Sequence, residues 1–221
     1  MAAAVLAGAG SAAALGPIGG GATVGVTASR PGDTIVVDAF LPVAPATTYL
    51  ISDSVLAGIA TTGATDLLTG TQWRPDLGPC RRLVAPSCSI MNSPPPPTVM
   101  DELAMLQAPP SGTDLLVIAT GYNDSASRFA SDLAAVVGRA RSAGFRHIAW
   151  LTYRTDGNGS RFSGYASQNA TLRAAVASGA YPDVTIWDFD AFTNDQRSWF
   201  GGDNLHLTSA GAVAVGPVLQ G

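Results

Sequence analysis

The stretch that decides the fold is DLLVIA at residues 114–119, which runs directly into TGYND at 120–124. Five consecutive apolar side chains, from Leu115 to Ala119, have the length of one β-strand. A continuous apolar run of this length indicates a strand that is buried on both faces, as in a parallel sheet. Parallel strands require crossover connections, so helices are expected on either side of this strand along the chain.

Strands and helices are predicted to alternate outward from this run. The clearest helix spans 127–143, where Phe129, Leu133, Val136 and Val137 recur at helical spacing and Gly144 supplies a C-terminal cap. Further helices are expected at 55–62, 98–106, 165–178 and 208–219, and further strands at 33–38, 49–51, within 66–73, at 146–151 and at 184–187. This alternation predicts an α/β fold with a mostly parallel sheet covered by helices on both faces.

The chain of 221 residues is predicted to hold one folded domain, residues 47–221, behind a distinct N-terminal segment, residues 1–46. Residues 1–22 are almost entirely small and apolar and resemble the core of a signal peptide or of a membrane anchor, although no Arg or Lys precedes them. The segment favours a secreted or cell-envelope protein, with membrane anchoring as an open alternative. Residues 74–97 carry seven prolines and are expected to be irregular.

The charge pattern excludes two classes of function. The net charge is −4 and basic residues form no run, which argues against nucleic acid as a partner. All 12 basic residues are Arg, so Schiff-base chemistry on a lysine is excluded.

The two cysteines, Cys80 and Cys88, favour a short-loop disulfide, which would imply an oxidising compartment. Two free buried thiols are the alternative. A cysteine pair with no nearby His cannot form the usual four-ligand zinc site, and the sequence shows no metal-ligand cluster.

Three segments carry residues suited to acyl transfer, and each falls just after a predicted strand or before a helix. Ser54 lies at a strand-to-helix turn, where the first amides of the helix favour negative charge. Asn123 follows the buried strand through Gly121, and its side-chain amide could donate to an oxyanion. Since ligands bind beyond the carboxyl ends of parallel strands, these segments should converge. The structural alternatives are an N-cap serine and an Asx turn.

Of the two histidines, His206 is the candidate base. Asp203 precedes it by three residues and could hold its Nδ1, which leaves Nε2 free to take a proton from Ser54. His147 begins a predicted strand, at the opposite edge of the sheet, and is therefore interpreted as structural.

These segments resemble the sequence blocks of the SGNH hydrolases, also called GDSL-type esterases and lipases. Gly121-Tyr122-Asn123-Asp124 and Asp203-Asn204-Leu205-His206 reproduce two blocks intact, whereas Ser52-Asp53-Ser54 departs from Gly-Asp-Ser at its first position. The resemblance covers roughly residues 47–221 and implies a flavodoxin-like three-layer α/β/α sandwich. It implies catalysis by Ser54, His206 and Asp203, with Asp53 and Gly121 in support, and it implies no metal and no organic cofactor.

The resemblance also implies an oxyanion hole made by the Ser54 amide, by Asn123 and by one further backbone N–H. The residue that supplies this third donor is not evident, and we favour Arg81 over Gly78. The predicted function is hydrolysis of an O-acyl ester on a small molecule, lipid or glycan. Two alternatives remain: an O-acyltransferase that acts on a glycan or lipid with the same site, and a catalytically silent carbohydrate- or lipid-binding module.

Overall fold

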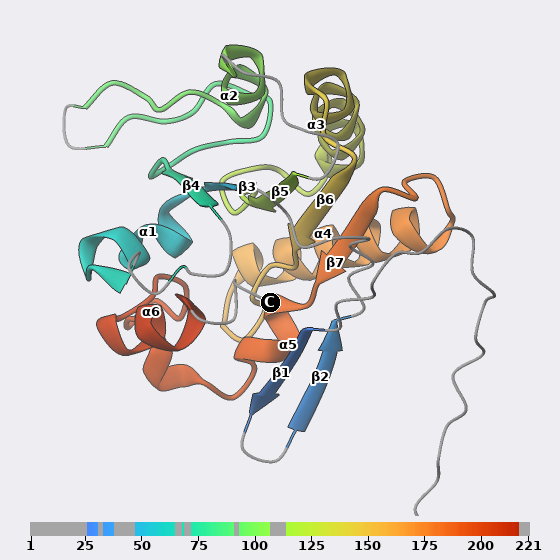
Figure 1. The fold of residues 1–221 in the computed structure, drawn as a ribbon. Coiled ribbons are helices and arrows are strands. Elements are labelled where there is room, and N and C mark those ends of the chain that lie inside the picture. The colour runs from blue at the N-terminus through green and yellow to red at the C-terminus, as the bar shows by residue number, and fades with distance from the viewer. Residues whose placement is uncertain are drawn as a thin grey trace, which may run out of the picture.

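A five-stranded parallel sheet forms the centre of the molecule (Figure 1). The computed structural model describes residues 47–64, 68, 72–90, 93–106 and 114–216, together with the backbone of 26–30 and 33–37. The strands of the sheet are β3 (Thr47–Ser52), β4 (Gln72–Leu77), β5 (Leu115–Ala119), β6 (His147–Leu151) and β7 (Val184–Trp187). Their spatial order is β4-β3-β5-β6-β7, and every neighbouring pair is parallel. This is the flavodoxin-like order, so the predicted fold class is confirmed.

Helices cover both faces of this sheet. They are α1 (Ser54–Thr61), α2 (Val99–Met105), α3 (Phe129–Ala143), α4 (Ser160–Ala177), the short α5 (Phe189–Thr193), the 3₁₀ turn η2 (Arg197–Trp199) and α6 (Ser209–Val215). On one face α3 packs between α2 and α4, and on the other α1 packs against α6 (Figure 1). The layers are therefore helix, sheet and helix.

The core is centred on β5, whose five side chains are all buried. Leu50 of β3 and Trp150 of β6 flank it and are fully inaccessible to solvent. Helix α3 contributes Val136 and Val137 from the apolar stripe that the sequence indicates. It ends at Gly144, which adopts a left-handed φ of 108° as predicted for its C-terminal cap.

Two predicted boundaries were wrong, and one short helix was missed. Strand β4 runs from Gln72 to Leu77, whereas the prediction placed it within 66–73. The prediction failed because β4 is an edge strand whose side chains are largely exposed, and because local rules assign its proline, Pro75, to a loop. Helix α4 begins at Ser160 instead of Tyr165, and α5 was not predicted. The other expected strands and helices of the sandwich are confirmed, although residues 217–219 of the last helix lie outside the described part.

The N-terminal region is described only in part. Strand β2 (Asp33–Val37) matches the expected strand, and it pairs antiparallel with β1 (Val26–Arg30) in a separate sheet. The predicted leader or anchor at residues 1–22 and the domain boundary at residue 46 lie outside the described residues. Within the described part of the chain, every helix is too short or too polar to cross a bilayer.

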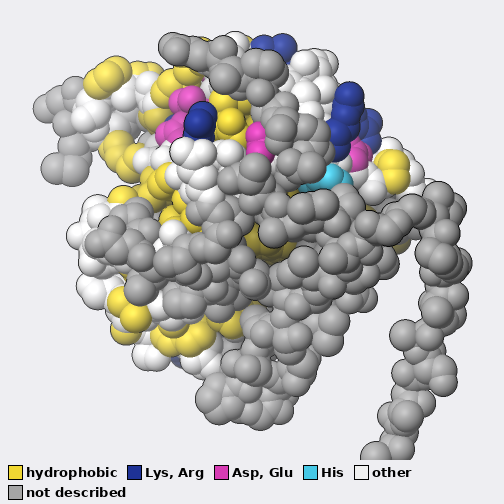
Figure 2. Space-filling model, in the orientation of Figure 1, with side chains coloured by type: hydrophobic (Ala, Val, Ile, Leu, Met, Phe, Trp, Pro, Cys, Tyr) yellow, Lys and Arg dark blue, Asp and Glu magenta, His cyan; other side chains and the backbone are white. Residues whose placement is uncertain are grey.

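The segment between β4 and α2 projects from the sandwich and carries hydrophobic side chains (Figure 2, upper left). Ile90 and, on α2, Met105 are exposed there. A groove of about 650 Å³ lies between this segment and α2, with Val84, Pro96 and Met100 among its lining residues. Val84 directly follows Leu83, whose N–H donates to Asp124 Oδ2 at 3.1 Å, so the groove adjoins the loop that follows β5.

Candidate active site

The structure brings Ser54, His206 and Asp203 into direct contact. The Nε2 of His206 lies 2.9 Å from Ser54 Oγ, and its Nδ1 lies 2.6 Å from Asp203 Oδ2. Both distances are those of hydrogen bonds. The contact of Ser54 with His206 joins residues 152 positions apart in the chain, so the folded sheet, and not local sequence, makes this pair.

Ser54 is placed by the turn from β3 into α1. Asp53 caps the helix and accepts a hydrogen bond from Val55 N–H through its Oδ1 at 3.0 Å. Ser52, which stands where the resembling family has glycine, ends β3 with its hydroxyl buried and donating to Ala119 O at 3.2 Å. Ser52 has no positive φ, so a serine fits this turn without backbone strain.

Asp53 also ties the turn that carries Ser54 to the loop after β5. Its Oδ2 accepts hydrogen bonds from the N–H groups of Gly121 and Tyr122, at 3.3 and 3.2 Å. Complete burial raises the pKa of Asp53 to about 6, and the three backbone donors act in the opposite direction. The carboxylate therefore fixes two neighbouring strand ends relative to each other.

The loop after β5 needs glycine at position 121. Gly121 has a φ of 139°, and a Cβ there would lie 2.1 Å from the hydroxyl oxygen of Tyr153. Asn123, two residues further on, is held by its own side chain, whose Nδ2 donates to Arg81 O at 3.1 Å. An amide nitrogen carries two N–H groups, so the second one remains for a ligand.

Arg81 does not have the geometry expected of it. Its backbone N–H donates to Gly78 O at 3.0 Å, and the N–H of Gly78 donates to Ser52 O at 3.0 Å. Because both amides are used within the main chain, the structure does not support either one as the third oxyanion donor. The carbonyl of Arg81 instead orients Asn123, and its buried guanidinium forms two hydrogen bonds with Asp76 at 2.9 and 2.7 Å.

Residues 80–88 form the wall beside Asn123. The predicted disulfide between Cys80 and Cys88 is present, and Cys88 N–H also donates to Cys80 O at 3.3 Å. Asp124 accepts from Leu83 N–H in this wall, and burial raises the pKa of Asp124 to about 7. The disulfide closes the loop that carries the carbonyl of Arg81.

The loop that carries Asp203 and His206 is closed by its own backbone. Gly201 N–H donates to His206 O at 2.8 Å, and Asn204 takes a left-handed φ of 57°, a conformation that Asn tolerates. Asp203 Oδ1 accepts from the N–H groups of Leu205 and His206. Partial burial raises the pKa of Asp203, but the hydrogen bonds from the His206 ring and these two N–H groups outweigh it, and the pKa lies below its usual value.

The other histidine lies away from this site. His147 is the first residue of β6 and pairs in register with Leu115, the first residue of β5, so it sits at the amino edge of the sheet. Burial lowers the pKa of His147, and Asp183 partly offsets this effect. The described residues contain no group of three or more His, Cys, Asp or Glu side chains that could hold a metal ion.

Two arginines beside the loop of residues 201–206, the candidate catalytic loop, were not predicted. Arg161 donates to Asp203 O at 2.8 Å, and Arg154 donates to Asn204 O at 3.2 Å. Both follow β6 at the carboxyl edge of the sheet. The rule that ligands bind at this edge was the signal that could have singled them out.

The fold is the α/β sandwich that SGNH and GDSL hydrolases share, and the comparison with solved structures confirms the resemblance at the level of the fold. A lipolytic protein of the G-D-S-L family from Veillonella parvula superposes with a TM-score of 0.58 at 13% identity, over 78% of this chain and 94% of that one. The catalytic domain of peptidoglycan O-acetyltransferase A from Streptococcus pneumoniae gives 0.54 at 19% identity, over 80% and 92%. An acetylxylan esterase from Geobacillus stearothermophilus gives 0.53 at 12% identity, over 80% and 93%. No protein-family model and no curated protein matches the sequence.

Proposed function

We propose that the protein is a serine hydrolase that cleaves an O-acyl ester through an acyl-enzyme. The observation that carries this proposal is the unbroken series of contacts from Ser54 Oγ through His206 to Asp203, at 2.9 and 2.6 Å. A serine, an imidazole and a carboxylate in this order form the triad that activates a hydroxyl for attack on a carbonyl. The shared fold of known esterases agrees with this chemistry.

In the acylation step, Ser54 Oγ forms a bond to the ester carbonyl carbon while its proton moves to His206 Nε2. Asp203 holds the other ring nitrogen and stabilises the imidazolium. The carbonyl electrons move to oxygen, where the N–H of Ser54 and the free N–H of the Asn123 amide donate to them. Collapse of the tetrahedral species expels the alcohol oxygen, which takes the proton from His206.

In the second step, water repeats this sequence on the acyl-enzyme. His206 takes a proton from the water, the hydroxide adds to the acyl carbon, and Ser54 leaves with the proton as the free acid forms. No redox partner and no metal ion is needed for the balance of either step.

An O-acyltransferase is the second candidate, because the superposed Streptococcus pneumoniae domain belongs to a peptidoglycan O-acetyltransferase. In that reaction the hydroxyl of a glycan replaces water in the second step, while the roles of Ser54, His206 and Asp203 stay the same. A silent binding module remains the third candidate, although Ser52, the feature that suggested it, is accommodated without strain.

The test of the main proposal is labelling with a fluorophosphonate probe, followed by identification of the modified residue by mass spectrometry. We expect the label on Ser54, none in Ser54→Ala, and normal labelling in Ser127→Ala, which changes an exposed serine. An unlabelled wild type would refute the proposal. Assays with p-nitrophenyl esters of graded chain length, with and without a glycan acceptor, then separate hydrolysis from transfer.

We also propose that the protein works in an oxidising compartment, secreted or at the cell envelope. The support is the disulfide between Cys80 and Cys88, since such bonds are rare where thiols are kept reduced. Fractionation of cells that express the full-length protein, with an antibody as readout, tests this assignment. Recovery of the whole pool in the cytosol as free thiols would contradict it.

A further inference from the structure

Arg154 is a fully buried cation beneath the catalytic loop. It lies three residues after β6, and its guanidinium is bound on every side. Its Nε donates to Asn204 O at 3.2 Å, its Nη2 to Asp156 Oδ2 at 2.5 Å, and its Nη1 to Thr193 O. The ring of Phe200 packs against the guanidinium carbon, 4.0 Å from the ring centroid. Such a group is held in one place by four different contacts.

The contact with Asn204 falls within the Asp203–His206 segment. Asn204 is the residue with the left-handed φ, so the direction of its carbonyl decides how the loop turns from Asp203 to His206. Phe200, on which Arg154 stacks, directly precedes this loop in the chain, and it pairs with Leu207, which directly follows the loop. Arg154 therefore touches the loop at its base and at its turn.

The backbone of Arg154 reaches the opposite wall of the site. Its N–H donates to the hydroxyl of Tyr122 at 2.8 Å. The N–H of Tyr122 in turn donates to Asp53, and Tyr122 immediately precedes Asn123. One residue thus links the loop of the general base to the loop of the oxyanion donor.

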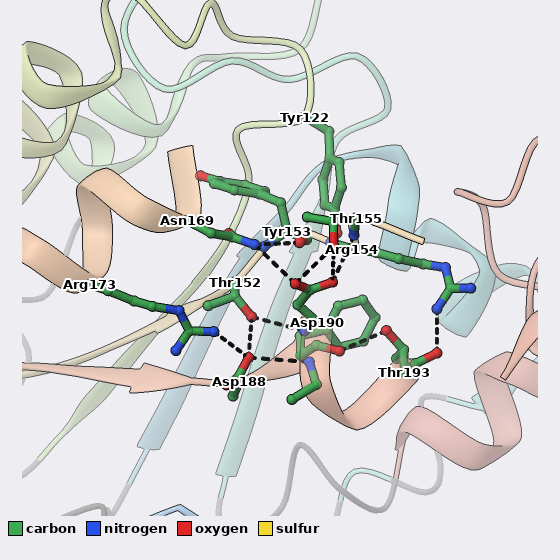
Figure 3. Close-up of polar contacts among 12 residues, drawn as sticks. Tyr122, Thr152, Tyr153, Arg154, Thr155, Asn169, Arg173, Asp188, Asp190 and Thr193 are labelled. Atoms are coloured by element: carbon green, nitrogen blue, oxygen red, sulfur yellow. Dashed lines mark hydrogen bonds and ion pairs between the residues drawn. The ribbon is translucent and has the colours of Figure 1, made fainter. Parts of the chain in front are cut away.

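The segment that carries Arg154 is itself held by a polar network (Figure 3). Asn169 forms two hydrogen bonds with the backbone of Tyr153, both of 2.7 Å. Asp190 accepts from Thr155 N–H at 2.7 Å, and the N–H of Asp190 donates to Thr152 Oγ1 at 2.9 Å. The residues on both sides of Arg154 are therefore fixed to α4 and α5, which gives the guanidinium a rigid base.

Burial of this charge calls for an explanation beyond stability. A buried ion pair is often no more stabilising than apolar side chains of equal volume, and its best-attested benefit is to select one arrangement. Here the arrangement selected is that of the catalytic loop. We propose that Arg154 is a positioning residue, which holds Asp203 and His206 in register with Ser54 and couples them to the loop of Asn123. This inference rests on the proposed function.

The variants Arg154→Met and Arg154→Lys test this role. Met keeps much of the volume but donates no hydrogen bond, while Lys keeps the charge but cannot reach three acceptors in the fixed fork of a guanidinium. We expect kcat for a short p-nitrophenyl ester to fall about 100-fold in Arg154→Met, since a displacement of about 1 Å costs this much, and to recover partly in Arg154→Lys. KM should change less than about threefold, because Arg154 lies below the site and touches no substrate.

The matched control is Arg173→Met. Arg173 donates to Asp188 at 2.8 Å in the same network but is half exposed and touches no residue of the catalytic loop (Figure 3). It should keep wild-type kcat. The second readout is the proton resonance of His206 Nδ1–H, which reports its hydrogen bond with Asp203 without any turnover. We expect this signal in the wild type and in Arg173→Met, and its loss or a large shift in Arg154→Met.

Two outcomes overturn the inference. One is a folded Arg154→Met, or a folded Arg154→Lys if the Met variant does not fold, that retains wild-type kcat. The other is an unchanged His206 Nδ1–H resonance in that folded variant. An inactive wild type that resists the fluorophosphonate probe refutes the proposed function instead, and the resonance still tests the role of Arg154 in that case.

Discussion

Replacing Asp53 with asparagine is expected to remove a pH dependence of the stability and to lower the activity. Burial raises the pKa of Asp53 from 3.8 to about 6, and the hydrogen bonds from Val55, Gly121 and Tyr122 only partly offset it. A pKa that is higher in the folded than in the unfolded state means that the folded state binds the proton more tightly. The contribution of Asp53 to stability is therefore fully present below about pH 3.8, and it is lost as the pH rises through 6.

The size of this effect follows from the two pKa values. A shift from 3.8 to about 6 corresponds to about 3 kcal/mol between the protonated and ionised limits, of which about 2 kcal/mol falls between pH 4.5 and 8. Asparagine does not titrate, so the free energy of unfolding of Asp53→Asn, relative to the wild type, should rise by about 2 kcal/mol over this interval. Glu102, whose pKa burial raises to about 7, is present in both proteins and cancels in the difference. Asp124 cancels only in part, because the charge of Asp53 helps burial to raise its pKa to about 7.

Activity should fall in the same variant. The carboxylate of Asp53 accepts hydrogen bonds on both oxygens, whereas the amide of Asn has one acceptor oxygen and one donor nitrogen. Either the Val55 N–H or the N–H groups of Gly121 and Tyr122 must then face an NH₂ group. The turn that carries Ser54 and the loop that carries Asn123 lose their common anchor. We therefore expect kcat/KM to fall about 10- to 100-fold.

The assay is urea unfolding of both proteins at half-unit steps from pH 4.5 to 8, with esterase kinetics on the same samples. Stability curves that stay parallel within about 0.5 kcal/mol would show that Asp53 carries no raised pKa in the folded state. Full activity of Asp53→Asn would refute the role of the carboxylate as the anchor of both loops.

Three further predictions concern the same site. Gly121→Ala should destabilise the fold by about 2–4 kcal/mol in thermal unfolding, because its Cβ would overlap both the ring and the hydroxyl of Tyr153 at a left-handed φ. Equal Tm values for Gly121→Ala and wild type would contradict this overlap. Replacing Cys80 and Cys88 with serine should lower the free energy of unfolding by about 2.5 kcal/mol and should lower kcat. An unchanged denaturant midpoint would mean that the loop needs no cross-link. Asn123→Ala should lower kcat by about 100- to 1000-fold with little change in KM, and a loss confined to KM would remove it from the oxyanion hole.

The elements with strong local patterns were predictable from the sequence. β5 is a run of apolar side chains buried on both faces, and α3 has a continuous apolar stripe with a glycine cap, so both agree with the structure within two residues. β4 was displaced because an edge strand that is largely exposed shows neither alternation nor an apolar run. The early start of α4 at Ser160 was missed because serine and glycine at 163–164 reduce helix propensity, which burial of Phe162 and Tyr165 overrides.

The parts of the site that lie in short motifs were predictable, and those that depend on tertiary contacts were not. The contact of Ser54 with His206 follows from the strand order, which places both on the carboxyl edge of the sheet. The direction of the Arg81 amide depends on a turn closed by Gly78, which no motif specifies. Arg154 was missed because an isolated arginine in a loop is normally exposed, and only the acceptors from distant segments explain its burial.

The 152-residue separation of Ser54 and His206, the proposed nucleophile and base, has a consequence for biosynthesis. A nascent chain exposes Ser54 to the cell long before His206 leaves the ribosome, yet a serine without its imidazole partner is chemically inert. The emerging polypeptide is thus harmless to surrounding esters until His206 has emerged and the sheet has folded. Proteolytic removal of the final segment after Phe200 would return it to that dormant condition while sparing every strand of the sheet.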